Sequence, residues 1–398
     1  MPVTPSMRTN ALLVSLLLLA CGAPTGGPDG SISQLDAGVI TDAGVTADAG
    51  TSDAGVVTVL RVKYPAGTRA VFARGSKLPF NWNTGLPMVK VDDTTWSLSV
   101  TTVAEDLEWK PLLDDATWSK GPNYNGRLGQ VNEVAPRFFR DAGEWTRRWP
   151  TFTSTLLGNT RGIYVYLPPT YLENTAARMP VVYMHDGQNL FDPNAAFGGV
   201  TWGVPQTMDT AANDGRFREA IVVGAENAGG ARISEYTPTS DPMYGGGNGD
   251  LYLRMLVEEL KPRVDAELRT KPSREDTVLI GSSLGGLISS YAGVRKADTF
   301  GLIGAMSPSV WWNNRVLLTT VSQTTSTRPL RVYVDSGDSG NSNDGVSDTR
   351  ALAAAYRTLG YVDGSTLEHL VQPGATHTES AWASRLPGAL EFLLGPGR

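Results

Sequence analysis

A serine between two glycines is the pattern in this chain that points most directly to chemistry. Residues 281–285 are Gly-Ser-Ser-Leu-Gly, which is the G-x-S-x-G spacing with Ser283 at its centre. An apolar run precedes the motif and small residues follow it, so we expect a strand, a sharp turn and a helix start. Glycines relieve the crowding of such a turn. The motif predicts that Ser283 is a nucleophile and that the N–H of Leu284 stabilises an oxyanion.

A nucleophilic serine needs a general base, and the chain has few candidates. It contains three histidines, of which His369 and His377 follow Ser283. His369 lies within an apolar strand pattern, which favours a packed side chain. His377 lies in the loop after that strand, where catalytic groups of open α/β sheets gather. We therefore expect His377 to be the base.

The third member of a triad is a carboxylate that fixes the histidine tautomer. The run Asp-Ser-Gly-Asp-Ser-Gly-Asn-Ser-Asn-Asp at 335–344 offers Asp335, Asp338 and Asp344. Asp335 directly follows a strand, where a carboxylate can tie down the turn. Asp338 lies at a short loop distance, whereas Asp344 requires the loop to fold back. We favour Asp338 and keep Asp344 as the alternative.

Residues 150–394 have the pattern of an α/β domain that could position these groups. Apolar runs at 162–167, 180–184, 220–224, 277–280, 302–306, 330–334 and 367–371 predict buried strands. Helical spacing of apolar residues spans 251–268 and 349–359. Alternating strands and helices predict a mostly parallel sheet covered by helices on both faces.

Residues 57–140 differ in pattern and predict a small all-β sandwich. Short alternating runs occur at 57–62, 95–100 and 107–110, with turn residues between them. Four tryptophans lie here: Trp82, Trp96, Trp109 and Trp118. This segment resembles the carbohydrate-binding sandwiches attached to starch- and glycogen-acting enzymes, whose exposed aromatic rings stack on sugars. For any single tryptophan we favour a place in the core.

The N-terminal residues predict an export signal followed by a tether. Residues 1–20 carry one base, no acid and an apolar run too short to span a bilayer. They precede Cys21, the sole cysteine, and resemble a bacterial lipobox, which implies cleavage and lipidation at Cys21. An ordinary secretory signal is the alternative. Residues 21–56 repeat Asp-Ala-Gly and predict a disordered tether. We expect an exported, membrane-anchored lipoprotein on the outer membrane or cell surface.

The composition of the chain limits the classes of partner and ligand that we expect. The formal net charge is −6, which argues against nucleic acid as the main partner. Three histidines and one cysteine argue against a histidine-rich metal site. We expect neither a cofactor nor a metal.

Five motifs in order resemble the putative-esterase family of α/β-hydrolases, which includes siderophore esterases, feruloyl esterases and esterase D. They are MHDGQNLF at 184–191, RISEYTP at 232–238, GSSLGG at 281–286, SPSVWW at 307–312 and HTESAW at 377–382. The resemblance covers about residues 150–394. It implies a triad of Ser283, His377 and an acid.

The resemblance also implies a substrate site around the triad. The loop after the strand 181–184 would supply a second oxyanion N–H, at Gly187 or Gln188. His185 and Asp186 would orient that loop. Trp311 either walls an acyl pocket or packs beneath it.

We therefore expect a serine carboxylic ester hydrolase that works through an acyl-enzyme. Its substrate would be a small-molecule or polysaccharide-linked ester, such as a siderophore, feruloyl or acetyl ester. The alternatives are an acyltransferase of the same fold and a non-catalytic carbohydrate-binding lipoprotein. The intact pair of Ser283 and His377 speaks against the last of these.

Overall fold

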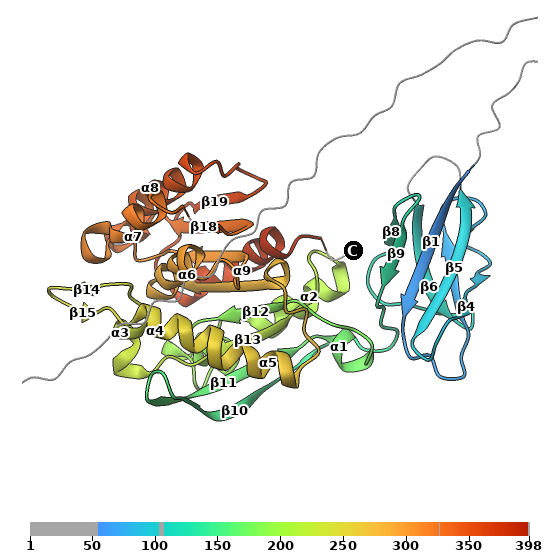
Figure 1. Ribbon diagram of the computed structural model, residues 1–398, viewed down its shortest axis with the longest axis horizontal. Coiled ribbons are helices and arrows are strands. Elements are labelled where there is room, and N and C mark those ends of the chain that lie inside the picture. The colour runs from blue at the N-terminus through green and yellow to red at the C-terminus, as the bar shows by residue number, and fades with distance from the viewer. Residues whose placement is uncertain (1–54, 103–106, 326, 397–398) are drawn as a thin grey trace, which may run out of the picture. The chain divides into compact units, whose positions relative to one another are not determined.

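A central sheet of eight strands organises the larger part of the chain (Figure 1). The computed structural model describes residues 55–102, 107–325 and 327–396. The strand order is β10-β11-β13-β12-β16-β17-β18-β19. Pairing is parallel from β13 to β19, whereas β10 and β11 add antiparallel strands at one edge.

Every strand that the sequence predicts in this region is present. The bounds are β11 Asn159–Leu167, β12 Val181–Met184, β13 Ile221–Ala225, β16 Thr277–Ser282, β17 Leu302–Met306, β18 Arg331–Gly337 and β19 Leu367–Gln372. The strands β12, β13, β16 and β17 are buried at every position, which explains their unbroken apolar sequences.

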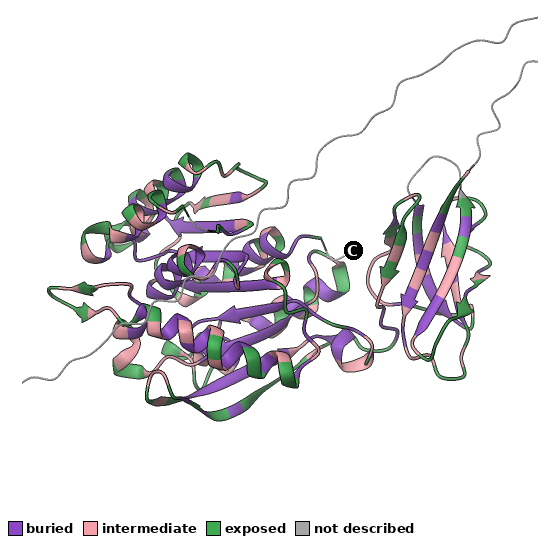
Figure 2. Cartoon of the chain, in the orientation of Figure 1, coloured by how far each residue is buried: buried purple, intermediate pink, exposed green. Residues whose placement is uncertain are grey.

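Helices cover both faces of the sheet, as predicted. On one face pack α4 (Gly249–Arg254), α5 (Lys261–Glu267), α6 (Leu284–Arg295), α7 (Trp312–Ser322) and α8 (Val346–Thr358). On the other pack α2 (Val204–Asp214) and α9 (Glu379–Leu394). Alternate residues of β12 supply the two cores, Val181 and Tyr183 to the first and Val182 and Met184 to the second. The buried sheet stands out in Figure 2.

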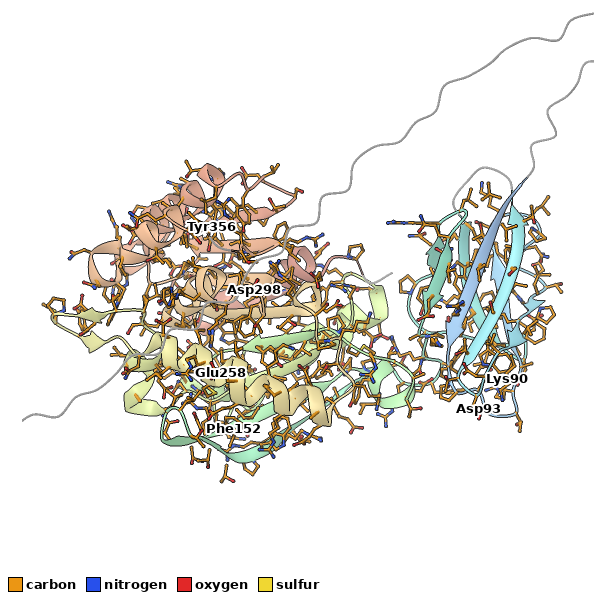
Figure 3. The ribbon with its side chains drawn as sticks, in the orientation of Figure 1. Lys90, Asp93, Phe152, Glu258, Asp298 and Tyr356 are labelled. Atoms are coloured by element: carbon orange, nitrogen blue, oxygen red, sulfur yellow. The ribbon has the colours of Figure 1, made fainter. Side chains whose placement is uncertain are left out.

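The first core reaches from one edge of the sheet to the other. Phe152 of β10 and Tyr356 of α8 both belong to it and are labelled in Figure 3. Each is buried, at 4% and 2% exposure.

Short helices and one hairpin connect these elements. They are α1 (Pro169–Glu173), α3 (Arg232–Glu235), and the 3-10 turns η1 (Gly187–Asn189), η2 (Phe197–Gly199), η3 (Gly229–Ala231), η5 (Arg274–Asp276) and η6 (Asn341–Gly345). The hairpin β14 (Ser240–Asp241) with β15 (Gly245–Gly246) extends away from the sheet (Figure 1).

Two features differ from the sequence prediction. The helix expected at 251–268 contains a π-helical turn, η4 (Met255–Leu260), which ends directly before α5, whose second residue is Pro262. Proline has no N–H to donate, so the regular α-helical ladder cannot continue through it. The strand β10 (Glu144–Ser154) was not predicted because it is an edge strand, mostly exposed, and lacks an apolar run.

Residues 56–134 form the predicted all-β sandwich of two sheets. One has the order β4-β5-β1-β9 and the other β3-β2-β6-β7, with β8 paired to β6. The bounds are β1 Val56–Lys63, β2 Val71–Gly75, β3 Leu86–Pro87, β4 Val89–Lys90, β5 Thr95–Thr102, β6 Leu107–Leu113, β7 Thr117–Trp118, β8 Tyr124–Gly126 and β9 Val131–Val134.

The four tryptophans of the sandwich divide into two kinds. Trp96 and Trp109 belong to its core, as expected. Trp82 is half-buried and Trp118 is 39% exposed, with ring centroids 6.2 Å apart. Sugar binding by this pair stays a prediction.

The predicted signal, Cys21 and most of the tether lie outside the described residues. Along 55–102, 107–325 and 327–396, no helix is both long enough and apolar enough to cross a bilayer.

Candidate active site

Ser283 sits on a strained turn between β16 and α6. Its backbone has φ 57° and ψ −121°, a left-handed conformation that non-glycine residues rarely adopt. The neighbouring Gly281 has no room for a side chain, because a Cβ there would lie 2.7 Å from Cδ2 of His185. The turn therefore has the strand–turn–helix geometry that the G-x-S-x-G motif predicts.

Leu284 is the first residue of α6. The first N–H groups of a helix have no partner within it and carry partial positive charge. The backbone N–H of Leu284 therefore lies at the N-terminus of α6, directly after Ser283, and its contact with an oxyanion stays a prediction.

Ser283 and His377 line one cavity of about 340 Å³. The Oγ of Ser283 lies 3.3 Å from the Oγ of Ser309. The cavity lining combines aromatic rings with polar and charged groups: Asp186, Gln188, Asn189, Phe197, Trp202, Asn227, Arg232, Ser282, Glu379 and Trp382.

His377 is held from two sides. Its Nδ1 lies 2.6 Å from Oδ1 of Asp344. The ring packs edge-on against Trp382, with centroids 4.9 Å apart and planes at 86°. The imidazole side chain remains 42% exposed, so a substrate can reach it.

The preference for Asp338 as the partner of His377 is wrong, because Asp344 occupies that position. Asp338 is exposed, and its Oδ1 accepts a hydrogen bond from the N–H of Gly374 at 2.7 Å. The loop folds back through three successive left-handed residues, Ser342 to Asp344, with φ between 47° and 57°. Serine, asparagine and aspartate tolerate that conformation better than most residues, which makes so tight a return possible.

The carboxylate of Asp344 is buried, and its side chain has no exposed surface. Burial alone raises the pKa of Asp344, but hydrogen bonds from His377, the Ser307 hydroxyl and the Gly337 N–H outweigh it. The pKa of Asp344 therefore lies below its ordinary value, and the carboxyl is ionised at neutral pH.

The loop after β12 approaches the sheet closely at Gly187. A Cβ there would lie 2.5 Å from the carbonyl of Gly224, so only glycine fits. Gln188 lines the cavity, and its Oε1 accepts a hydrogen bond from the N–H of Asn227. The structure thus brings Gln188 to the same cavity as Ser283.

Asp186 anchors this loop through Arg232. The guanidinium donates from Nε and Nη2 to the two oxygens of Asp186, each at 2.8 Å. Burial opposes the charge of Arg232, yet the Asp186 carboxylate holds its pKa above the usual value. The side chain of Arg232 is 27% exposed, so the cavity presents a permanent cation.

His185 is neutral and structural. Its Nδ1 lies 2.9 Å from the hydroxyl of Tyr252, and burial lowers the pKa of His185 to about 3. His369, in β19, also has a lowered pKa because it is desolvated.

Trp311 does not line the cavity that contains Ser283 and His377. Its ring is 49% exposed and packs against Tyr244 and Trp312 instead. The sequence prediction of a substrate contact at Trp311 is therefore not supported by this geometry. The aromatic residues of the cavity are Phe197, Trp202 and Trp382.

The comparison with known protein families agrees with this geometry. Residues 154–393 match the family model described as "Putative esterase". The chain belongs to the putative-esterase family. The match assigns carboxylic ester hydrolysis to the α/β domain.

Individual relatives cover the same domain. The chain is 28% identical over 255 residues to the "Uncharacterized protein YbbA" of Bacillus subtilis, covering 61% of this chain and 95% of that protein. It is 31% identical over 175 residues to the "Iron(III) salmochelin esterase" of Escherichia coli O6:H1, covering 43% of this chain and 38% of that protein. The match to the salmochelin esterase thus covers well under half of that relative.

A solved structure shows the same fold. A ferulic acid esterase superposes with a TM-score of 0.50 at 21% identity, covering 64% of this chain and 98% of that one. Its name says what that protein acts on, and the similarity to it supports the fold alone.

Sequence reasoning missed two residues next to the triad candidates. Ser307 accepts from and donates to buried partners at a left-handed φ of 38°. Arg385 is buried on α9, within a face otherwise formed by Trp382, Leu386 and Ala389. A charged residue on an apolar helix face was the available signal, because a buried cation requires a buried anion.

Proposed function

We propose that this esterase is a serine hydrolase whose triad is Ser283, His377 and Asp344. The observation that carries the proposal is the arrangement of the site. Ser283 and His377 line one cavity, while Asp344 lies 2.6 Å from the Nδ1 of His377.

The reaction depends on which ring nitrogen of His377 carries the proton. Asp344 holds Nδ1 protonated, so Nε2 is the nitrogen that takes the proton of Ser283. The Oγ of Ser283 attacks the ester carbonyl, the tetrahedral intermediate collapses, and the alcohol leaves with the proton from His377. Water then repeats the sequence on the acyl-enzyme and releases the acid.

The oxyanion is stabilised by backbone N–H groups on both sides of Ser283. One comes from Leu284 at the start of α6, and the other from the loop at Gly187 and Gln188. The steric fit of Gly187 against Gly224 supports this role, because it holds the loop close to the sheet. Removal of one such donor typically costs 10²- to 10³-fold in kcat.

The cavity favours an ester that carries aromatic and acidic oxygen groups. Phe197, Trp202 and Trp382 offer ring faces, and Arg232 offers the exposed part of a guanidinium whose Nε and Nη2 bind Asp186, although Asp186 and Glu379 add carboxylates to the same lining. A siderophore ester has both features, and the salmochelin-esterase relative supports that class. A feruloyl ester shares the aromatic ring but has a single phenolic hydroxyl, which stays protonated at neutral pH, in place of an ionised catecholate pair.

Kinetics on a panel of substrates test this preference for siderophore esters over feruloyl esters. We expect the highest kcat/KM for a ferric catecholate siderophore ester, lower values for feruloyl esters and the lowest for p-nitrophenyl acetate. Arg232→Met also frees Asp186 and its loop, so it should lower both values, but that for the siderophore by a clearly larger factor than that for p-nitrophenyl acetate. A preference for the acetate would contradict the proposed substrate class, and transfer of the acyl group to an added alcohol in preference to water would favour the acyltransferase.

We also propose that a lipid on Cys21 anchors the chain at a bacterial membrane. The support is the position of the sole cysteine after the apolar run of residues 1–20. Mass spectrometry of the membrane fraction should find an acylated N-terminal Cys21, and Cys21→Ala should release the protein. Unchanged membrane retention of Cys21→Ala would contradict the anchor.

A further inference from the structure

A buried polar cluster lies behind the carboxylate that contacts His377. Its members are Asp335 of β18, Ser307 after β17, and Arg385 and Trp382 of α9. The side chains of Asp335 and Arg385 are 0% and 1% exposed. Burying two charged side chains costs desolvation energy, and even a paired buried ion pair often stabilises a protein no more than apolar residues would. Stability alone therefore does not explain this pair.

Arg385 is paired with Asp335 and also reaches the Asp344 carboxylate. Its Nε donates to Oδ2 of Asp335 at 2.8 Å. Its Nη2 donates to the Oγ of Ser307 at 2.9 Å and lies 3.8 Å from Oδ2 of Asp344. One guanidinium therefore connects a structural anion to the anion that contacts His377.

Ser307 has only one possible hydrogen-bond arrangement. Its Oγ lies within hydrogen-bond distance of Arg385 Nη2 and of Trp382 Nε1, which can only donate. Its own proton must therefore point to Oδ2 of Asp344, at 2.6 Å. The N–H of Gly337 also donates to that oxygen at 2.5 Å, which leaves Oδ1 to face His377.

The backbone of Ser307 is fixed as well. Its N–H donates to both the carbonyl and the Oδ1 of Asp335, at 2.9 and 3.0 Å. These bonds hold it at φ 38°, a conformation that a serine adopts only when its surroundings require it. Asp335 thus fixes the position of the hydroxyl that Arg385 orients.

We propose that Arg385, paired with Asp335 and acting through Ser307, is a positioning residue that keeps the Asp344 carboxylate ionised and directed at His377. This inference rests on the proposed function of the same site. Arg385 does not line the cavity. It acts on the reaction through Asp344.

The charged groups around the pair determine the sign of the pH effect. Besides each other, Asp344 and His377 face Asp335 on β18, Arg385 and Glu379 on α9, and Asp186 with Arg232 across the cavity. Removal of the Arg385 charge, 3.8 Å from Asp344, favours protonation of the Asp344–His377 pair. Removal of the Asp335 charge has the opposite sign, but Asp335 reaches Asp344 through Arg385 and Ser307, so we expect the loss of Arg385 to decide the direction. A reaction of Ser283 requires the deprotonated base, so its rate falls at low pH. This fall, the acid limb of the pH profile, should then move to higher pH.

The test measures the rate at which a fluorophosphonate labels Ser283 in the full chain, as a function of pH. In that reaction the Oγ of Ser283 bonds to phosphorus, fluoride leaves, and His377 takes the serine proton. The central variant is Arg385→Met with Asp335→Asn, which removes both charges and leaves neither one buried alone. We expect it to melt within a few degrees of wild type, to label about tenfold more slowly, and to have its acid limb about half a pH unit higher.

Two further variants separate positioning from folding. Ser307→Ala keeps both charges and removes the hydroxyl, and it should also slow labelling about tenfold. Arg161→Met is the control, because Arg161 is equally buried and pairs with Glu235. It should lower the melting temperature and leave the acid limb unmoved. If the double variant does not fold, the pH dependence of the labelling rate is measured in Ser307→Ala and Arg385→Lys instead.

The outcomes are distinct. An unchanged rate and limb in the double variant and in Ser307→Ala would overturn the inference. The inference would also be overturned if the double variant labelled more slowly but kept the acid limb of wild type. An equal shift of the acid limb in Arg161→Met would overturn it too. If wild type is not labelled at Ser283, the proposed function itself fails.

Discussion

At the scale of single residues, the proposed ester hydrolysis depends on one oxygen nucleophile, the Oγ of Ser283. Ser283→Ala removes the Oγ and leaves the turn and the cavity in place. We expect ester hydrolysis to fall on the order of 10⁴-fold, with the melting temperature nearly unchanged. Steady-state kinetics on purified protein measures this. Near-wild-type turnover after removal of contaminating esterases would place the nucleophile elsewhere.

The two candidate acids give a paired prediction. Asp344→Asn presents an amide to Nδ1 of His377 and stabilises the wrong tautomer, so kcat should fall on the order of 10⁴-fold. Asp338→Asn keeps an oxygen for the N–H of Gly374 and should stay within about threefold of wild type. A large loss of kcat in Asp338→Asn, with Asp344→Asn near wild type, would instead assign Asp338 as the acid.

The sequence alone identifies Ser283 and His377 as candidates, because each needs only a local pattern to be recognised. The glycines around Ser283 specify a sharp turn, and His377 is the histidine in a loop after a strand. The sequence does not favour Asp344 over Asp338, because the position of Asp344 depends on a left-handed turn of three residues. Such a turn has no apolar periodicity to reveal it.

At the scale of elements, the end of β18 must lie close to the loop that carries His377. A Cβ on Gly337 would overlap the carbonyl oxygen of Ala375. Gly337→Ala should therefore displace that loop and lower kcat at least tenfold, with a smaller effect on the melting temperature.

Gly388→Ala is the matched control for this substitution. Gly388 lies in α9, and a Cβ there meets nothing within 4 Å. This variant should retain activity and gain about 0.5–1 kcal/mol in the free energy of unfolding. Full activity in Gly337→Ala would show that the loop position is not constrained by this contact.

The predictability of the elements follows their burial. The strands β12, β13, β16 and β17 are buried on both faces and therefore have continuous apolar sequences. The strand β10 is mostly exposed at the sheet edge and gave no such signal. The interruption of the helix at 251–268 could have been anticipated from Pro262.

At the scale of the whole molecule, the Asp344 carboxylate links stability to pH. Its folded-state pKa lies below the ordinary value of 3.8, so it contributes stability above that pH and loses it as the pH falls through the lower folded value. Asp344→Asn lacks this contribution. The difference in melting temperature between wild type and Asp344→Asn should shrink as the pH falls from roughly 5 to 3. A difference that stays constant or grows would contradict the hydrogen bonding assigned to Asp344.

The two folds within the described residues could be predicted from changes in the sequence pattern. Period-two runs predicted the sandwich and alternating strands and helices predicted the α/β domain, because each fold buries its apolar residues with its own spacing. The partners of the sandwich could not be derived in this way. Core tryptophans such as Trp109 and surface tryptophans such as Trp118 occur in the same short segment.

The most direct test of the central claim is covalent labelling with a fluorophosphonate followed by peptide mapping. An activated serine reacts with this probe whatever the natural ester is. The account predicts one stoichiometric label, on Ser283, which is lost in Ser283→Ala and much slower in Asp344→Asn. A wild-type protein that is folded and stays unlabelled, or that carries the label on another residue, would contradict it.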